Sequence, residues 1–173
     1  MARIEYADPS RDAEVTALAQ RILAERGTMH NLYKMLLHSP PVAEGWLTFL
    51  TAIRQKCELP GRYRELAILR IALLNRAHYE YEGHVPHALR AGLKQSQIDA
   101  LENWQQSSEF DAVEKAVLSY ADSMTRQIQV PDDIFTAIKE HFGERQTVEL
   151  TATIGAYNCV SRFLESIKID SDG

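Results

Sequence analysis

Residues 62–92, RYRELAILRIALLNRAHYEYEGHVPHALRAG, contain the pattern on which the prediction of the fold depends most. Successive residues of an α-helix are turned by about 100°, so residues 66–74 are apolar on every side of a helical wheel except at Arg70. The apolar side chains spread round the wheel are Leu66, Ile68, Leu69, Ile71 and Leu73. A helix that is apolar all round is buried, so residues 66–74 are predicted to form the central helix of the core.

The second half of the same stretch crowds aromatic and titratable side chains into one short segment. They are Tyr79, Glu80, Tyr81, Glu82, His84 and His87. Polar groups directly after the most buried helix are candidates for chemistry, although a solvated helix face has the same pattern. Pro86 has no N–H for the carbonyl of Glu82, so we expect a kink between these two residues.

Composition and charge narrow the classes of protein. The chain has 173 residues, 45% hydrophobic and 25% charged, which is typical of a soluble globular protein with one domain or one domain and an extension. Its net charge of −5 makes neither nucleic acid nor an anionic membrane an expected partner.

No apolar run approaches the roughly 18 to 20 residues that span a bilayer, and the N-terminus lacks a signal-peptide pattern, so we expect a cytoplasmic protein. Cys57 and Cys159 match no CxxC or metal-ligand spacing, and we interpret both as buried, reduced thiols.

Amphipathic patterns and breakers divide the rest of the chain into helices. The expected helices span residues 11–26, 29–37, 42–57, 96–101, 108–124, 131–142 and 145–167. Capping boxes are expected to start two of them, at Ser96 and at Ser108. No segment alternates at period 2 over the length of a strand, and no NG or DG turn joins two such segments. The predicted fold is therefore all-α, with eight or nine helices.

Glu80 and His84 stand four residues apart, which places their Cβ atoms about 6 Å apart on one face of a helix. A carboxylate beside an imidazole favours the charged ring and can orient it, which suits general acid–base catalysis near neutral pH. The alternative is an exposed pair worth only a few tenths of a kcal/mol. His87 could join these two residues at a metal, but the expected kink at Pro86 argues against that geometry, and no metal site is predicted.

Arg70 interrupts the apolar half of the stretch and cannot be buried without a partner. One interpretation is a structural ion pair with a glutamate elsewhere in the chain, for which Glu149 is the first choice. The others are that Arg70 crosses a subunit interface or that it binds a substrate carboxylate. We favour structural pairing over substrate binding.

The patterns R-E-L-A-I-L-R-x-A at residues 64–72 and Y-E-Y-E-G-H-V at residues 79–85 resemble the carboxymuconolactone decarboxylase family, which includes alkyl hydroperoxidase D. The resemblance covers roughly residues 40–165. It implies a multi-helix bundle of the alkyl hydroperoxidase D-like type that assembles into homo-oligomers such as trimers or hexamers. Residues 1–40 are then expected to be an N-terminal helical extension, and residues 41–173 one compact family-like domain.

Two branches of that family differ in the residues they carry here. The peroxidase branch has a glutamate, two cysteines and a histidine at the positions of Glu65, Ala77, Glu80 and His84. A peroxidatic site needs a thiolate and a resolving thiol, so the missing cysteines disfavour an alkyl hydroperoxidase-like antioxidant protein. The decarboxylase branch has a glutamate and a histidine at the positions of Glu80 and His84 and lacks an equivalent of Glu65. The chain resembles a third kind of member that combines the two patterns.

The resemblance implies an enzyme of the carboxy-lyase or isomerase type that needs no cofactor. In this interpretation His84 is the general acid–base, Glu80 orients it and Glu65 tunes or relays the proton, while Tyr79 either donates a hydrogen bond to an enolate or is a packed aromatic. The substrate would be a small carboxylated lactone or keto acid. The alternative is a non-catalytic oligomeric binding or scaffold protein, in which Glu65 faces solvent at the start of its helix, where the dipole favours an acid.

Overall fold

The computed structural model describes residues 1–172, and every regular element within them is helical. The prediction of an all-α fold with eight or nine helices is confirmed by nine α-helices in this part of the chain. The elements are α1 (Ala13–Arg26), α2 (Asn31–Leu36), α3 (Pro40–Thr51), the π-helix η1 (Ala52–Lys56), α4 (Gly61–Asn75), α5 (His78–Arg90), α6 (Gln95–Ala100), the 3₁₀ helix η2 (Leu101–Gln106), α7 (Ala112–Arg126), α8 (Asp132–His141) and α9 (Glu144–Ile167).

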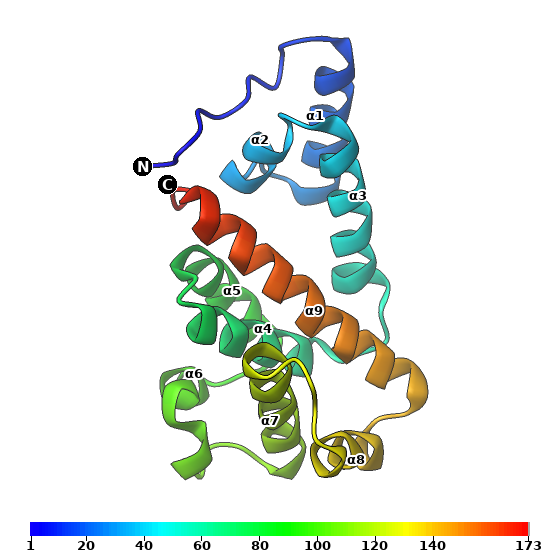
Figure 1. The fold of residues 1–173 in the computed structure, drawn as a ribbon, viewed down its shortest axis with the longest axis vertical. Coiled ribbons are helices and arrows are strands. Elements are labelled where there is room, and N and C mark those ends of the chain that lie inside the picture. Colours follow the sequence, from blue (N-terminus) through cyan, green and yellow to red (C-terminus); the bar gives the residue numbers. More distant parts are fainter. Residues whose placement is uncertain (173) are drawn as a thin grey trace. The chain divides into compact units, whose positions relative to one another are not determined.

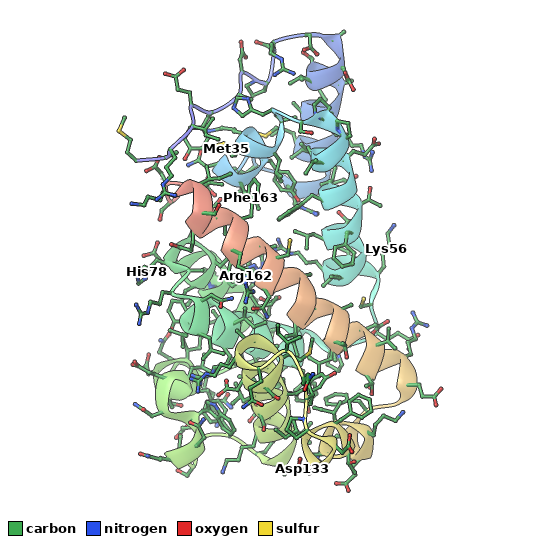
Figure 2. The ribbon with its side chains drawn as sticks, viewed as in Figure 1. Met35, Lys56, His78, Asp133, Arg162 and Phe163 are labelled. Atoms are coloured by element: carbon green, nitrogen blue, oxygen red, sulfur yellow. The ribbon has the colours of Figure 1, made fainter. Side chains whose placement is uncertain are left out.

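The helices form two compact units. Unit 1 comprises residues 1–56 and the end of the chain from Phe163, and unit 2 comprises residues 57–162. Figure 2 labels Lys56, Arg162 and Phe163, which mark these divisions. The division differs from the boundary expected at residue 40, because α3 packs with α1 and α2 and so remains in unit 1. The prolines at that point begin α3, where the first helical position needs no N–H donor.

In unit 1, helix α1 is capped at both ends. The carboxylate of Asp12 accepts a hydrogen bond from the N–H of Val15 at 2.9 Å, and Gly27 ends α1 in the left-handed conformation with φ 77°. The interior of this unit is apolar, and the rings of Trp46 and Phe163 pack with their centroids 5.2 Å apart. None of the residues predicted to carry the chemistry lies in this unit.

Unit 2 is built on α4, which packs against both α5 and α7 (Figure 1). Leu66, Ile68 and Leu69 have no exposed surface, so α4 is the buried central helix that its all-round apolar pattern predicts. A connection of two residues joins α4 to α5, with Arg76 in the left-handed conformation at φ 55°. The helical hairpin α4–α5 carries the candidate catalytic residues.

Helix α5 continues through Pro86 to Arg90, so the proline does not end the helix, and the expected kink stays a prediction. Pro86 is exposed, and water can replace the missing backbone donor on the solvent side of a helix. His84 therefore lies within a continuous helix, and the spacing of Glu80 and His84 on one face is preserved.

Two helix starts lie a few residues from their predicted positions. Helix α6 begins at Gln95, and the side chain of Gln97 accepts from the N–H of Lys94 at 3.1 Å. Helix α7 begins after Asp111, whose carboxylate accepts from the N–H of Glu114 while Glu114 accepts from the N–H of Asp111. The capping box of α7 is thus Asp111 with Glu114, because aspartate is as good an N-cap as serine.

Candidate active site

Glu65, Glu80 and His84 come together inside unit 2. Oε2 of Glu65 on α4 lies 2.7 Å from Nδ1 of His84 on α5, and Nε2 of the same ring lies 3.2 Å from Oε2 of Glu80. All three side chains are buried, with 7% or less of each exposed. Glu65 therefore points at His84 and does not face solvent at the start of its helix.

The two carboxylates decide the charge of the ring between them. Burial of His84 disfavours the charged imidazole, but the hydrogen bond to Glu65 and the negative charges of Glu65 and Glu80 outweigh burial and raise the pKa of His84. For Glu65 burial likewise disfavours the charged form, yet the hydrogen bond from His84 and the charge of Arg64 leave its pKa lowered. The two acidic side chains therefore favour the imidazolium form of the ring that lies between them.

One oxygen of Glu80 is buried without a well-formed hydrogen bond. Among the described residues, its Oε2 is shielded from solvent and has no hydrogen-bond partner of acceptable geometry, although Nε2 of His84 lies 3.2 Å away. We interpret this contact as an ion pair whose N–H is poorly aligned with the oxygen. Buried polar atoms are nearly always hydrogen-bonded, so this carboxylate oxygen is the atom of the site whose bonding capacity is least used.

Glu65 is fixed from both sides. Its Oε2 is taken by His84, and its Oε1 accepts a hydrogen bond from Nε of Arg64 at 3.2 Å. Because both oxygens are occupied, Glu65 can hold the imidazole ring but has little freedom to reach a substrate.

Tyr157 is the site residue for which sequence reasoning gave no role. It lies on α9, is buried, and packs its ring against His84 edge-on, with centroids 5.1 Å apart and an interplanar angle of 89°. The chain order gives no local signal for this contact, since the two residues belong to helices far apart in the sequence. Tyr79, the predicted hydrogen-bond donor, is half-buried on α5, and its role stays a prediction.

Arg70 has a different partner from the one predicted. Its Nη2 lies 2.8 Å from Oδ2 of Asp122 on α7, and its Nη1 donates to the carbonyl oxygen of Leu101 at 2.8 Å. Glu149 instead accepts from the N–H of Leu59 and from Arg145. The choice of Glu149 was wrong, because the chain brings α7 rather than α9 to the guanidinium. Only 4% of its side chain is exposed, so Arg70 lies in a buried ion pair, as the structural interpretation predicts.

The cysteines are reduced but not buried as predicted. Cys57 is half-buried and Cys159 is exposed. Burial and the charge of Glu149 raise the pKa of the Cys57 thiol, which disfavours the thiolate. Among residues 1–172, no cluster of three side chains suits a metal ion, and no helix is long and apolar enough to cross a membrane.

A comparison with protein-family models matches residues 40–123 to the carboxymuconolactone decarboxylase family. The uncharacterized protein YdfG of Bacillus subtilis (strain 168) is 28% identical over 101 residues, which cover 57% of this chain and 69% of YdfG. These matches confirm the resemblance that the motifs of residues 64–85 predicted.

Solved structures confirm the fold. A protein of unknown function from Agrobacterium tumefaciens, assigned to antioxidant defence as AhpD, superposes with a TM-score of 0.75 at 24% identity, covering 80% of this chain and 95% of that protein. The debrominase Bmp8 in complex with 2,3,4-tribromopyrrole superposes with a TM-score of 0.82 at 14% identity, covering 100% of this chain and 95% of Bmp8. The predicted alkyl hydroperoxidase D-like fold is therefore confirmed, and at these identities the likeness concerns the fold alone.

Proposed function

Residues 40–123 belong to the carboxymuconolactone decarboxylase family, and from this premise we propose that the protein is a cofactor-free acid–base enzyme. Its substrate is a small carboxylated lactone or keto acid, and its reaction is a decarboxylation or an isomerisation that moves a proton at carbon. The observation that carries the proposal is the buried chain of contacts from Glu65 through His84 to Glu80.

The geometry supports a different division of labour from the one expected. Glu65 is fixed by Arg64 and His84, so it is the residue that orients the imidazole and keeps it charged. Glu80 is the last residue in this chain of contacts, and its buried Oε2 has no aligned hydrogen-bond donor. We therefore assign proton exchange with the substrate to His84 Nε2 and Glu80, and orientation to Glu65.

Glu80 and His84 can remove and supply the protons that either reaction requires. In an isomerisation, the Glu80 carboxylate removes a proton from the carbon next to the substrate carbonyl, and the imidazolium of His84 stabilises the enolate until a proton returns to a different carbon. In a decarboxylation, the carbon–carbon bond breaks to release carbon dioxide, its electron pair forms an enolate, and the proton on His84 Nε2 passes to that carbon. Positioned proton transfer of this kind contributes typically about 10² to 10⁴ in rate.

The antioxidant alternative finds less support in this chain. AhpD and the debrominase Bmp8 share the fold, but their names carry over no activity at such identities. The two positions at which the peroxidase branch has cysteines hold Ala77 and Glu80, and neither side chain can attack a peroxide. The raised pKa of Cys57 disfavours its thiolate, so Cys57 is a poor substitute for the missing cysteines.

The scaffold alternative rests on Glu65 facing solvent, and the buried contact of Glu65 with His84 weighs against it. Assembly into a homo-oligomer, a trimer or hexamer, and a cytoplasmic location remain parts of the proposal. Light scattering after gel filtration measures the first, and cell fractionation measures the second.

The test is proton exchange and turnover on a panel of carboxylated lactones and β-keto acids. Nuclear magnetic resonance in D₂O follows exchange at carbon, and carbon dioxide release follows decarboxylation. We expect His84→Gln and Glu80→Gln each to lower the rate by about 10² to 10⁴. Glu82→Gln is the matched control, because Glu82 is an exposed acid on the same helix, and it should leave the rate unchanged. Full activity in His84→Gln, or no exchange and no turnover on any member of the panel, would contradict the proposal.

A further inference from the structure

Helix α4 carries three arginines inside unit 2, and they differ in how many of their donors are used. Arg62 donates to Glu114, Gln97 and the carbonyl of Gly92. Arg70 likewise uses all of its nitrogens on Asp122 and on the carbonyls of Leu101 and Glu102. Both guanidinium groups are therefore fully engaged in holding the fold.

Arg64 differs from the other two. It donates through Nε to Oε1 of Glu65 at 3.2 Å, and no acceptor among the described residues forms a hydrogen bond with its terminal nitrogens Nη1 and Nη2. Its side chain is 18% exposed, so part of it is reachable from solvent, while its Nε contacts a buried carboxylate. A guanidinium with two unused donors thus stands beside the Glu65–His84 pair.

The backbone of α4 leaves room for this guanidinium. A Cβ at Gly61, one turn before Arg64, would lie 3.3 Å from Nη2 and 3.9 Å from Cζ. Any side chain at position 61 would therefore crowd the terminal nitrogens or displace them. Because Gly61 has none, the fork formed by Nη1 and Nη2 stays open.

We propose that Arg64 binds a carboxylate of the substrate through Nη1 and Nη2 while its Nε remains on Glu65. The inference rests on the proposed acid–base function and adds the residue that selects an anionic substrate. The planar fork of arginine matches a carboxylate in a two-bond contact, which gives orientation as well as affinity. Glu65 then contacts both Arg64, which binds the substrate, and His84, which transfers the proton. One carboxylate therefore fixes the positions of both side chains.

This arrangement also constrains which carboxylate can leave. An ion pair with arginine stabilises a carboxylate more than the neutral carbon dioxide it would become, so a carboxylate held by Arg64 resists decarboxylation. A substrate that loses carbon dioxide here must therefore carry a second carboxylate, away from Arg64. A substrate that is only isomerised needs just the one.

The experiment measures binding without turnover. The probes are γ-butyrolactone-γ-carboxylate and its neutral carboxamide, titrated by calorimetry into the wild type, Arg64→Gln, Arg64→Lys and Arg126→Gln. Arg126 is an exposed arginine at the end of α7, so its variant matches the change in net charge. We expect the wild type and Arg126→Gln to bind the carboxylate about 10- to 100-fold more tightly than the carboxamide, as for hydrogen bonds to charged groups. Arg64→Gln should lose this preference and Arg64→Lys should retain part of it.

Two outcomes overturn the inference. One is a wild type that binds the carboxylate no more tightly than the carboxamide, including no measurable binding of either. The other is a preference that survives in Arg64→Gln. The His84 ring resonances and the melting temperature of Arg64→Gln show whether the site is intact. If Arg64 does not bind the carboxylate, the wild type still catalyses proton exchange but shows no preference that depends on Arg64. If the proposed acid–base function is wrong, the wild type prefers the carboxylate but catalyses no proton exchange.

Discussion

Nδ1 of His84 donates a hydrogen bond to Oε2 of Glu65 across 2.7 Å, although the two residues stand 19 positions apart on consecutive helices. This contact turns the imidazole so that Nε2 faces Glu80 on its own helix. The ring is thus held by one acid and presented to another.

The charge of His84 is open to direct measurement. Because the hydrogen bond to Glu65 and the negative charges of Glu65 and Glu80 outweigh the effect of burial, the pKa of His84 should lie above 6.5 in the folded protein. Glu65→Gln should lower that pKa, since the ring loses the closer acid but stays buried. Titration of the His84 ring resonances by nuclear magnetic resonance gives both values. A pKa below 6.5 in the wild type would show that burial dominates and that the ring is neutral.

The same pair makes stability depend on pH in a defined window. The raised pKa of His84 means that its contribution is complete below pH 6.5 and is lost as the pH rises through the folded value. The lowered pKa of Glu65 means that its contribution is present above pH 4.5 and is lost as the pH falls through the folded value. The difference in unfolding free energy between the wild type and Glu65→Gln/His84→Gln should therefore be largest between these pH values. Urea denaturation over a pH series measures it, and a maximum in alkaline solution would contradict the assignment.

The ion pair of Arg70 and Asp122 should matter for stability. Asp122→Asn leaves a guanidinium with 4% of its side chain exposed without its charged partner, and we expect a loss of about 3 to 5 kcal/mol in unfolding free energy. Asp99→Asn, an exposed acid on α6, should change it by less than about 0.5 kcal/mol. Chemical denaturation measures both variants. A small effect of Asp122→Asn would mean that the carbonyl contacts of Arg70 are sufficient.

Tyr157 should act through its ring. Tyr157→Ala removes the buried aromatic that packs on His84 and should lower the unfolding free energy by about 3 to 5 kcal/mol. Tyr157→Phe keeps the ring and should lose much less, with the His84 resonances little changed. Thermal and urea denaturation, together with the ring spectra, separate the two variants. Equal losses would place the contribution in the hydroxyl group instead.

The thiols should behave as unactivated cysteines. Cys159 is exposed and should react readily with a thiol reagent, whereas Cys57 should react slowly near neutral pH because burial and Glu149 raise its pKa. Labelling of Cys159→Ser and Cys57→Ser isolates one thiol at a time. Rapid consumption of an alkyl hydroperoxide that depends on Cys57 would contradict this view and revive the antioxidant alternative.

The fold was predictable where a local pattern carries a strong physical signal. The all-round apolar surface of residues 66–74 predicted a buried helix, and the helices expected at residues 11–26 and 131–142 lie within two residues of the observed bounds. Pro86 does not end its helix, and the kink expected there stays a prediction. The division into units was not predictable, since it depends on which helices α3 packs against.

The site was predictable in part, and the reason differs for each residue. Glu80 and His84 share a helix face by spacing alone, whereas Glu65 was placed with them by its position in the family motif. The partner of Arg70 was missed because Asp122 comes from a distant helix, whose orientation no local pattern reveals. Tyr157 and the open fork of Arg64 were missed for the same reason, because both depend on three-dimensional packing.

The two-residue connection between α4 and α5 also has a consequence for how the chain folds. Closing a segment as short as the one between Glu65 and His84 loses little chain entropy, and contacts of short sequence separation form early. Tyr157, by contrast, must arrive from a helix that follows much later in the chain. During refolding the acid–base pair should therefore assemble with the hairpin, before the aromatic ring that encloses it has docked.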